Sequence, residues 1–187
     1  MVESKYMTIL ILHGIGGCAG IHWQQWLYDN LVRLGHEVIM PNLPSADRPD
    51  RKTWLKTIQE IIRNIDTNNL IIIAHSLSVA TSLDLIEETP VRKLISVSGF
   101  AFDYGAELNG YFLKERTINF DKVSKNLEKA FVIYGDNDPY VPQEALKSLA
   151  DNLKVKPEII PNAGHLNTDS GYTTFPRLLE IIENENT

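Results

Sequence analysis

The sequence predicts an α/β fold with three layers, in which helices cover both faces of a doubly wound parallel sheet. Six short apolar runs, most of them rich in β-branched residues, are nearly continuous rather than alternating, as expected of strands buried on both faces. Segments with the apolar spacing of amphipathic helices lie between these runs. Strands that alternate with helices imply right-handed crossovers and therefore such a sheet. The expected strands cover residues 7–12, 37–40, 70–74, 93–97, 130–134 and 158–160.

The expected helices are marked by apolar stripes and by residues that start or stop helices. Trp23, Leu27 and Leu31 belong to a stripe that stops at Gly35, and glycine is common just after a helix end. Pro142 lies at a first-turn position, which proline favours. The longest connection between expected elements spans residues 98–129 and carries several aromatic side chains. The expected helices cover residues 22–34, 51–65, 77–87, 142–153 and 175–182.

Composition indicates one globular domain over residues 1–187, with 43% hydrophobic and 22% charged residues. The net charge of −6 argues against nucleic acid or an anionic membrane as a partner. Cys18 is the only cysteine, so an internal disulfide is impossible and a reducing compartment is favoured. The apolar stretch at residues 7–12 is too short for a signal peptide or a membrane span. We expect a cytoplasmic protein and leave its oligomeric state open.

A candidate nucleophile, Ser76, lies between the expected strand at 70–74 and the helix that begins at residue 77. This strand–turn–helix context is typical of a nucleophile elbow, which needs small residues two positions before and after the serine. Ala74 and Ser78 occupy these positions instead of the usual glycines. A serine at such a junction is also a common helix N-cap, which is the structural alternative.

An acid and a base follow Ser76 in chain order, each after an expected strand. Asp138 is the preferred acid, because Asp136 lies in the turn that leaves the strand, where aspartate commonly bonds its own backbone. His165 follows the last strand and is the only histidine placed after the acid. We expect the side chain of His75 to diverge from that of Ser76. A serine needs an imidazole to take its proton, and the imidazole needs a carboxylate to fix its tautomer.

The loop His13-Gly14-Ile15-Gly16-Gly17 follows the first expected strand. Its backbone N–H groups can approach a developing oxyanion, and we expect the N–H groups of Ile15 and Leu77 to form the oxyanion hole. A phosphate-binding loop is the rival interpretation, but Ala19 stands where G-x-G-x-x-G requires its third glycine. The sequence also lacks H-E-x-x-H and paired cysteines, so we expect no metal and no cofactor.

These motifs resemble the α/β-hydrolase superfamily over the whole chain, and more narrowly the small lidless serine hydrolases of the YdeN and retinoblastoma-binding protein nine group. The resemblance implies six parallel strands in the order 2-1-3-4-5-6, a Ser76–Asp138–His165 triad, and activity on esters or similar acyl compounds. The motifs that carry it are His13-Gly14, His22-Trp23-Gln24-Gln25-Trp26-Leu27, Pro41-Asn42-Leu43-Pro44, His75-Ser76-Leu77, Gly135-Asp136-Asn137-Asp138-Pro139-Tyr140-Val141-Pro142 and Ala163-Gly164-His165-Leu166-Asn167.

The expected function is hydrolysis of a small-molecule ester or similar acyl bond through an acyl-enzyme on Ser76. We expect Gly14, His13, Trp23, Phe100 and Phe102 to contact the substrate, although core filling explains aromatic residues equally well. Two alternatives stay open: a non-catalytic binding module on a hydrolase scaffold, and a thioesterase or small peptidase with the same triad.

Overall fold

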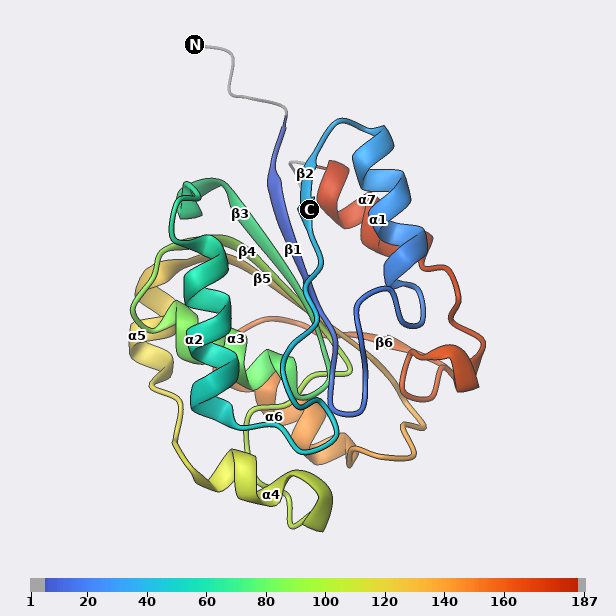
Figure 1. The fold of residues 1–187 in the computed structure, drawn as a ribbon. Helices are drawn as coiled ribbons and strands as arrows, with labels where there is room; N and C mark the ends of the chain where they lie inside the picture. Colours follow the sequence, from blue (N-terminus) through green and yellow to red (C-terminus); the bar gives the residue numbers. More distant parts are fainter. Residues whose placement is uncertain (1–5, 185–187) are drawn as a thin grey trace.

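The computed structural model describes residues 6–184, so the ends of the single domain expected over residues 1–187 lie outside the described residues, and that domain assignment stays a prediction. Its centre is a parallel sheet of six strands in the order β2-β1-β3-β4-β5-β6, which confirms the predicted fold class and strand order (Figure 1). The strands are β1 (Thr8–Leu12), β2 (Glu37–Ile39), β3 (Leu70–His75), β4 (Val91–Val97), β5 (Leu127–Gly135) and β6 (Glu158–Ile160).

Helices connect all the strands and include two elements that the sequence did not predict. The expected helices are α1 (Gln24–Arg33), α2 (Arg51–Ile62), α3 (Ser78–Ile86), α6 (Gln143–Leu153) and α7 (Pro176–Glu183). The connection between β4 and β5 contains two more, α4 (Glu107–Lys114) and α5 (Phe120–Asn126). The short 3₁₀ turns η1 (Thr67–Asn69) and η2 (Thr168–Ser170) complete the list. None of these helices is long and apolar enough to cross a membrane.

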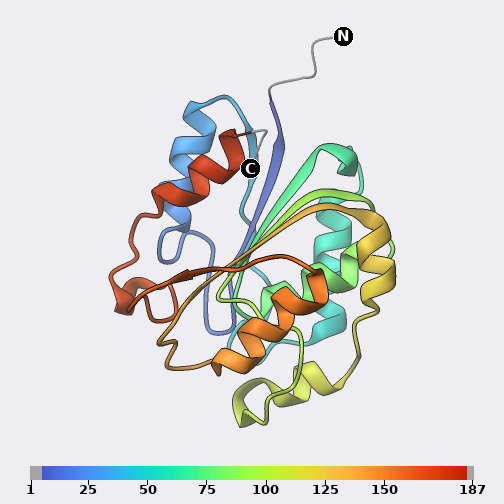
Figure 2. The ribbon, with the colours of Figure 1, turned by 180° about the vertical axis from the view of Figure 1, so that it is seen from behind.

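Alternate residues of the central strands enter two separate cores, one on each face of the sheet. Ile71 and Ile73 of β3 pack on one face with α1 and α7. Ile72 and Ala74 point to the opposite face, where α2, α3, α5 and α6 pack. Figures 1 and 2 show these two helical layers from opposite sides. Burial on both faces explains why the strands are apolar runs without alternation.

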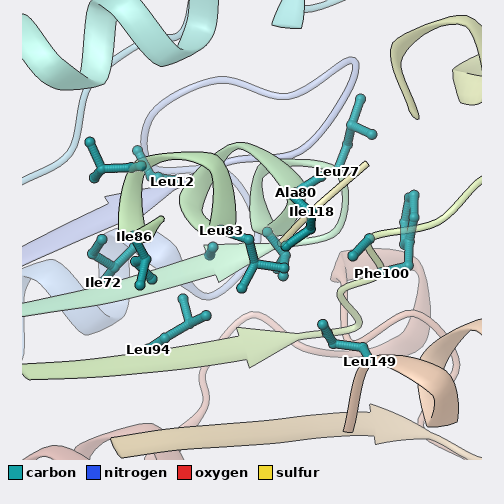
Figure 3. Packing of buried hydrophobic residues seen from close by; sticks show 14 of the residues in the cluster. Leu12, Ile72, Leu77, Ala80, Leu83, Ile86, Leu94, Phe100, Ile118 and Leu149 are labelled. Carbon is teal, nitrogen blue, oxygen red and sulfur yellow. The ribbon is translucent and has the colours of Figure 1, made fainter. Parts of the chain in front are cut away.

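The helix that follows Ser76 is buried along its whole length. Every residue of α3 is buried, because α2 covers the side that faces away from the sheet. Figure 3 shows Leu83 and Ile86 of α3 beside Ile72 and Leu94 of the underlying strands. Side chains packed to this density leave the first turn of α3 little freedom, so the elbow before it is fixed by the core.

The loops that carry the predicted motifs gather at the carboxyl ends of the strands. Leu12 of β1 pairs with Ala74 of β3, and His75 pairs with Val97 of β4, so these strands end at one level. Parallel α/β sheets bind their ligands at this edge. Helix α4 lies beyond the same edge, apart from the two main helical layers, in both views (Figures 1 and 2).

Candidate active site

Ser76 occupies a strained turn between β3 and α3. Its φ of 58° lies in the left-handed region, which non-glycine residues seldom adopt. Its backbone N–H donates to Val97 O at 2.9 Å, and its carbonyl accepts from Val79 N–H at 3.2 Å. The serine is 6% exposed. This is the local geometry expected of a nucleophile elbow.

The two departures from glycine at the elbow fit the structure. Ala74 is a fully buried residue of β3, paired with Leu12 on one side and Ser96 on the other. Ser78 is also buried, and its hydroxyl donates to the carbonyl of His75 at 2.9 Å. The Ser78 side chain fills the space that a glycine would leave empty. Its hydrogen bond to the backbone of the turn stabilises the elbow.

Asp138 and Asp136 have different partners. The Asp138 Oδ2 atom accepts a hydrogen bond of 2.7 Å from His165 Nδ1–H. Its Oδ1 atom accepts from the N–H groups of Tyr140 and Val141, at 2.9 and 3.0 Å. Asp136 was expected to bond its own turn, but its Oδ1 accepts from Asn162 N–H in the loop after β6, at 2.7 Å. The geometry therefore favours Asp138 as the partner of the histidine.

The loop of residues 161–171, which we call the His165 loop, can reach β5 because residue 135 is glycine. A Cβ atom on Gly135 would lie 2.3 Å from the carbonyl oxygen of Gly164, which is too close for any side chain. Asn137 adds a second link, since its Oδ1 accepts from Gly164 N–H at 2.8 Å. With Nδ1 of His165 protonated toward Asp138, the neutral ring has an unprotonated Nε2 that can accept a proton.

Ser76 and His165 line one cavity of about 350 Å³ at the carboxyl edge of the sheet. Within the described residues, the Ser76 hydroxyl makes no hydrogen bond to His165, although both side chains line the same cavity. Catalytic hydrogen bonds are often long before substrate binds. The cavity lining is mainly apolar and contains no Asp, Glu, Lys or Arg; its larger apolar members are Ile15, Ile21, Phe100, Tyr104, Leu108, Tyr140 and Val141.

The loop after β1 lies directly against the nucleophile. A Cβ atom on Gly14 would lie 2.9 Å from Ser76 Cβ, so only glycine allows this approach. His13 fixes the loop from beneath: its Nε2 accepts from Leu43 N–H at 2.8 Å, and its Nδ1–H donates to Gly14 O at 2.9 Å. Burial lowers the pKa of His13, while the Gly14 bond opposes that shift. His13 is therefore neutral and orients the loop.

The two N–H groups expected in the oxyanion hole have no acceptor within residues 6–184. Neither Ile15 nor Leu77 donates a backbone hydrogen bond, whereas Gly16 and Gly17 in the same loop both do. Ile15 also lines the cavity, and Leu77 directly follows Ser76 at the start of α3. Free N–H groups beside a nucleophile can stabilise an oxyanion, so both residues remain candidates.

Three of the five expected substrate contacts lie away from the cavity. Gly14 and Phe100 line it, but His13, Trp23 and Phe102 do not. Trp23 is fully buried in the core beside α7, and Phe102 stacks on Phe120 at 5.7 Å. Their aromatic character reflects packing, which is the alternative explanation given above for such residues.

Two histidines that were not among the expected substrate contacts also line the cavity. His22, at the start of the expected helix of residues 22–34, accepts from Thr168 N–H through its Nδ1 at 3.2 Å. His75, expected to diverge from Ser76, is buried, and its Nε2–H donates to the carbonyl of His165 at 3.0 Å. The only sequence signal for their place in the cavity was that His22 directly precedes Trp23 and His75 directly precedes Ser76. No cluster of residues suited to a metal ion occurs in the described part of the chain.

Comparison with known proteins assigns the chain to a family. The sequence pattern of the serine hydrolase family matches residues 9–184, which is most of the chain. The chain belongs to the serine hydrolase family. Among relatives of this serine hydrolase, the hydrolase YdeN of Bacillus subtilis is 25% identical over 93% of each chain. The serine hydrolase RBBP9 of Rattus norvegicus is also 25% identical, over 97% of this chain and 96% of its own length.

Solved structures confirm the α/β-hydrolase fold of this serine hydrolase. The crystal structure of the ydeN gene product from B. subtilis superposes with a TM-score of 0.86, at 24% identity, over 94% of this chain and 96% of that one. Est1E from Butyrivibrio proteoclasticus gives a TM-score of 0.71 at 18% identity, over 97% of this chain and 87% of that one. At these identities the superpositions support the fold and leave the substrate to be inferred from the site.

Proposed function

We propose that this serine hydrolase cleaves small, uncharged carboxylic esters through an acyl-enzyme on Ser76. The observation that carries the proposal is the 2.7 Å hydrogen bond from His165 to Asp138, in a cavity whose wall also includes Ser76. A nucleophile in a strained elbow, a histidine with a fixed tautomer and a buried carboxylate are the three parts that acyl transfer needs.

In the proposed acylation step, Ser76 Oγ attacks the ester carbonyl while His165 Nε2 takes the hydroxyl proton. The side chain of Asp138 is fully buried, and it accepts a hydrogen bond from the Nδ1–H of the resulting imidazolium. The N–H groups of Ile15 and Leu77 stabilise the oxyanion of the tetrahedral intermediate. When the intermediate collapses, His165 gives its proton to the departing alkoxide, so the alcohol leaves and the acyl group remains on Ser76.

In the proposed deacylation step, water attacks the acyl-enzyme and His165 takes one of its protons. The second tetrahedral intermediate collapses to a carboxylic acid, and the proton returns to Ser76 Oγ. The cavity supports an apolar acyl group, because its wall combines Ile15, Phe100 and Leu108 with no charged residue. A charged acyl group would lose its hydration there without gaining an ionic partner.

A fluorophosphonate probe tests the nucleophile directly. We expect the probe to label Ser76, as mapped by peptide mass spectrometry, and the label to disappear in Ser76→Ala. A folded wild-type protein that resists the probe would favour the alternative of a non-catalytic binding module.

Competing substrates test the type of bond. We expect p-nitrophenyl esters with short, uncharged acyl chains to be hydrolysed faster than thioesters, aminoacyl amides or esters with a carboxylate on the acyl chain. Higher kcat/KM for the thioester or the amide of a matched acyl group would replace the carboxylesterase proposal with a thioesterase or a small peptidase.

A further inference from the structure

The His165 loop is strained and is fixed by ring side chains from two other segments. Asn162, Gly164 and Leu166 all have positive φ, between 50° and 55°. Left-handed conformations cost about 1–2 kcal/mol at non-glycine residues, so the loop does not adopt this shape without external contacts. The contacts from Asp136 and Asn137 secure only the part of the loop that precedes His165.

The part of the loop from His165 onward is bound by His75, Trp23 and His22. The Nε2–H of His75 donates to the carbonyl of His165 at 3.0 Å. The Nε1–H of Trp23 donates to the carbonyl of the next residue, Leu166, at 2.9 Å. The Nδ1 of His22 accepts a hydrogen bond from the backbone N–H of Thr168 at 3.2 Å and also lies 3.0 Å from the Thr168 hydroxyl oxygen. All three residues use backbone groups of the loop at His165 or beyond, so together they define its path on the carboxyl side of the His165 side chain.

The same rings also contact one another. The ring centroids of His75 and His165 lie 4.9 Å apart, and those of His22 and His75 lie 5.4 Å apart. Trp23 meets His75 edge-on at 6.0 Å. His75 is therefore in contact with both the backbone and the ring of the histidine that takes the proton in the proposed reaction.

The contact of His22 with Thr168 N–H requires a neutral ring, whereas His75 donates through Nε2–H in either protonation state. Burial, followed by the nearby His165, lowers the pKa of His75 well below its usual value. Burial and His165 also lower the pKa of His22, while Asp169 opposes the shift. A neutral His22 has the free Nδ1 lone pair that Thr168 N–H requires.

We propose that His75 and His22 are positioning residues that keep His165 in reach of Ser76 and of Asp138. This inference rests on the proposed function, because it assigns His165 the role of base. Neither residue transfers a proton; each acts through a backbone group of the His165 loop. Their contribution is therefore to kcat, because the geometry between base and nucleophile matters in the transition state rather than in substrate binding.

Matched substitutions at His75 separate the hydrogen bond from the volume of the ring. His75→Gln places an amide N–H near the position of Nε2, whereas His75→Phe retains a ring but has no donor. We expect His75→Phe to lower kcat and the rate of fluorophosphonate labelling by about 10²-fold, with KM within about threefold. We expect His75→Gln to stay within about threefold of wild type in both.

Matched substitutions at His22 test the second contact independently. The φ of His22 is 60°, which both asparagine and glycine tolerate. His22→Asn retains an acceptor near the position of Nδ1, and His22→Gly removes it. We expect roughly a 10-fold loss of kcat in His22→Gly and nearly normal kcat in His22→Asn.

The proposal is overturned if the two variants at each position behave alike, whether both are active or both are impaired. Hydrogen exchange at the backbone N–H of Thr168 gives a readout that does not need catalysis, and it should accelerate in His22→Gly but not in His22→Asn. A wild-type protein that resists the probe would defeat the proposed function, whereas the exchange data would still decide whether these residues fix the loop.

Discussion

The His165 loop and α4 line the same cavity but are attached to the fold in different ways. The His165 loop is joined to the turn after β5, to His75 beside the elbow and to the β1–α1 connection by hydrogen bonds along its length. Helix α4 contributes Leu108 and Asn109 to the cavity and is anchored mainly at its carboxyl end, by Arg51. The His165 loop is thus attached by hydrogen bonds to several segments, whereas α4 is attached through Arg51 and through the buried side chains of Phe112 and Leu113.

The anchor of α4 is a buried cation. Arg51 forms a bidentate pair with Asp84 at 2.6 and 2.9 Å, and both side chains are at most 2% exposed. Its remaining N–H groups donate to the carbonyls of Phe112, Leu113 and Arg116, at 2.9 to 3.2 Å. A cation at the carboxyl end of a helix also interacts favourably with the helix dipole. One side chain therefore joins α2, α3 and α4.

The difference predicts that substitutions near the His165 loop lower kcat, whereas substitutions at the attachment of α4 lower stability and selectivity. The largest effect is expected from Asp138→Asn, which takes away the carboxylate that fixes the His165 tautomer and stabilises its cation. We expect kcat to fall by about 10⁴-fold. Steady-state kinetics on a p-nitrophenyl ester measures the loss.

Asp136→Asn is the matched control for this prediction. Asp136 accepts a hydrogen bond from Asn162 N–H, and an asparagine oxygen can accept the same bond. We therefore expect kcat within about 10-fold of wild type. Comparable losses of several orders of magnitude in both variants would contradict the assignment of Asp138 as the acid.

Sequence reasoning was most successful for structural features that depend on a local turn. Ser76 and the end of β3 follow from an apolar run and the helix after it, because these features set the chain direction within a few residues. The fold class followed similarly from alternating periodicities. The preference for Asp138 over Asp136 agrees with the geometry, although its stated reason was wrong: Asp138 bonds its own turn, and Asp136 reaches across to another loop.

Features that depend on distant side chains could not be predicted. Helix α4 has only eight residues and contains Gly110, so its intrinsic helix propensity is low. Its position depends on Arg51, which is more than 50 residues away in sequence. His75 likewise lies 90 residues from its partner, His165. The sequence contains no local signal that a histidine beside the nucleophile will bind the loop that carries the base.

On the α4 side, Arg51→Met is expected to have the largest effect on stability. It leaves Asp84 buried without its bidentate partner, and burial already raises the pKa of Asp84 against the opposing influence of Arg51. We expect the free energy of unfolding to fall by about 3–5 kcal/mol, as measured by urea denaturation.

Lys52→Met on the same helix is the control for Arg51→Met. Lys52 pairs with Glu115 at 3.0 Å but is 84% exposed, so its removal should change stability by less than about 1 kcal/mol. Equal effects of the two substitutions would show that α4 does not depend on the buried cation.

Gly14→Ala tests how tightly the loop after β1 must approach the nucleophile. The new Cβ atom would lie 2.9 Å from Ser76 Cβ and 3.2 Å from the carbonyl of His75, so the loop must move away. The N–H of Ile15 would move with it, and we expect kcat to fall by roughly 10²-fold.

Gly16→Ala provides the comparison within the same loop. A Cβ atom on Gly16 meets nothing within 4 Å, but the φ of 68° is unfavourable for alanine. This variant should lose about 1–2 kcal/mol of stability while retaining kcat. A normal kcat in Gly14→Ala, or an equal loss of kcat in both variants, would remove the loop from the proposed oxyanion hole.

The smallest expected effect is a pH dependence that arises from three histidines at the carboxyl edge of the sheet. Burial lowers the pKa of His13, His22 and His75 in the folded state, and the shift is largest at His75. The unfolded chain therefore binds protons below about pH 6.5 that the folded chain excludes, and stability falls as the pH decreases. Each histidine contributes at most about 1.4 kcal/mol per pH unit within this window.

Thermal unfolding between pH 7.5 and 5.5 measures this dependence, and His75→Gln should flatten it because glutamine binds no proton. At pH 5.5 the backbone N–H groups of the His165 loop should lose more protection from hydrogen exchange than those of α4, because none of these three histidines bonds to Arg51 or to its partner Asp84. Asp84 acts in the opposite direction, because its raised pKa favours proton uptake by the folded state and adds stability as the pH falls. Wild type and His75→Gln both contain Asp84, so the difference between their slopes isolates the contribution of His75. An unchanged slope in His75→Gln would mean that this ring is not the group that resists protonation.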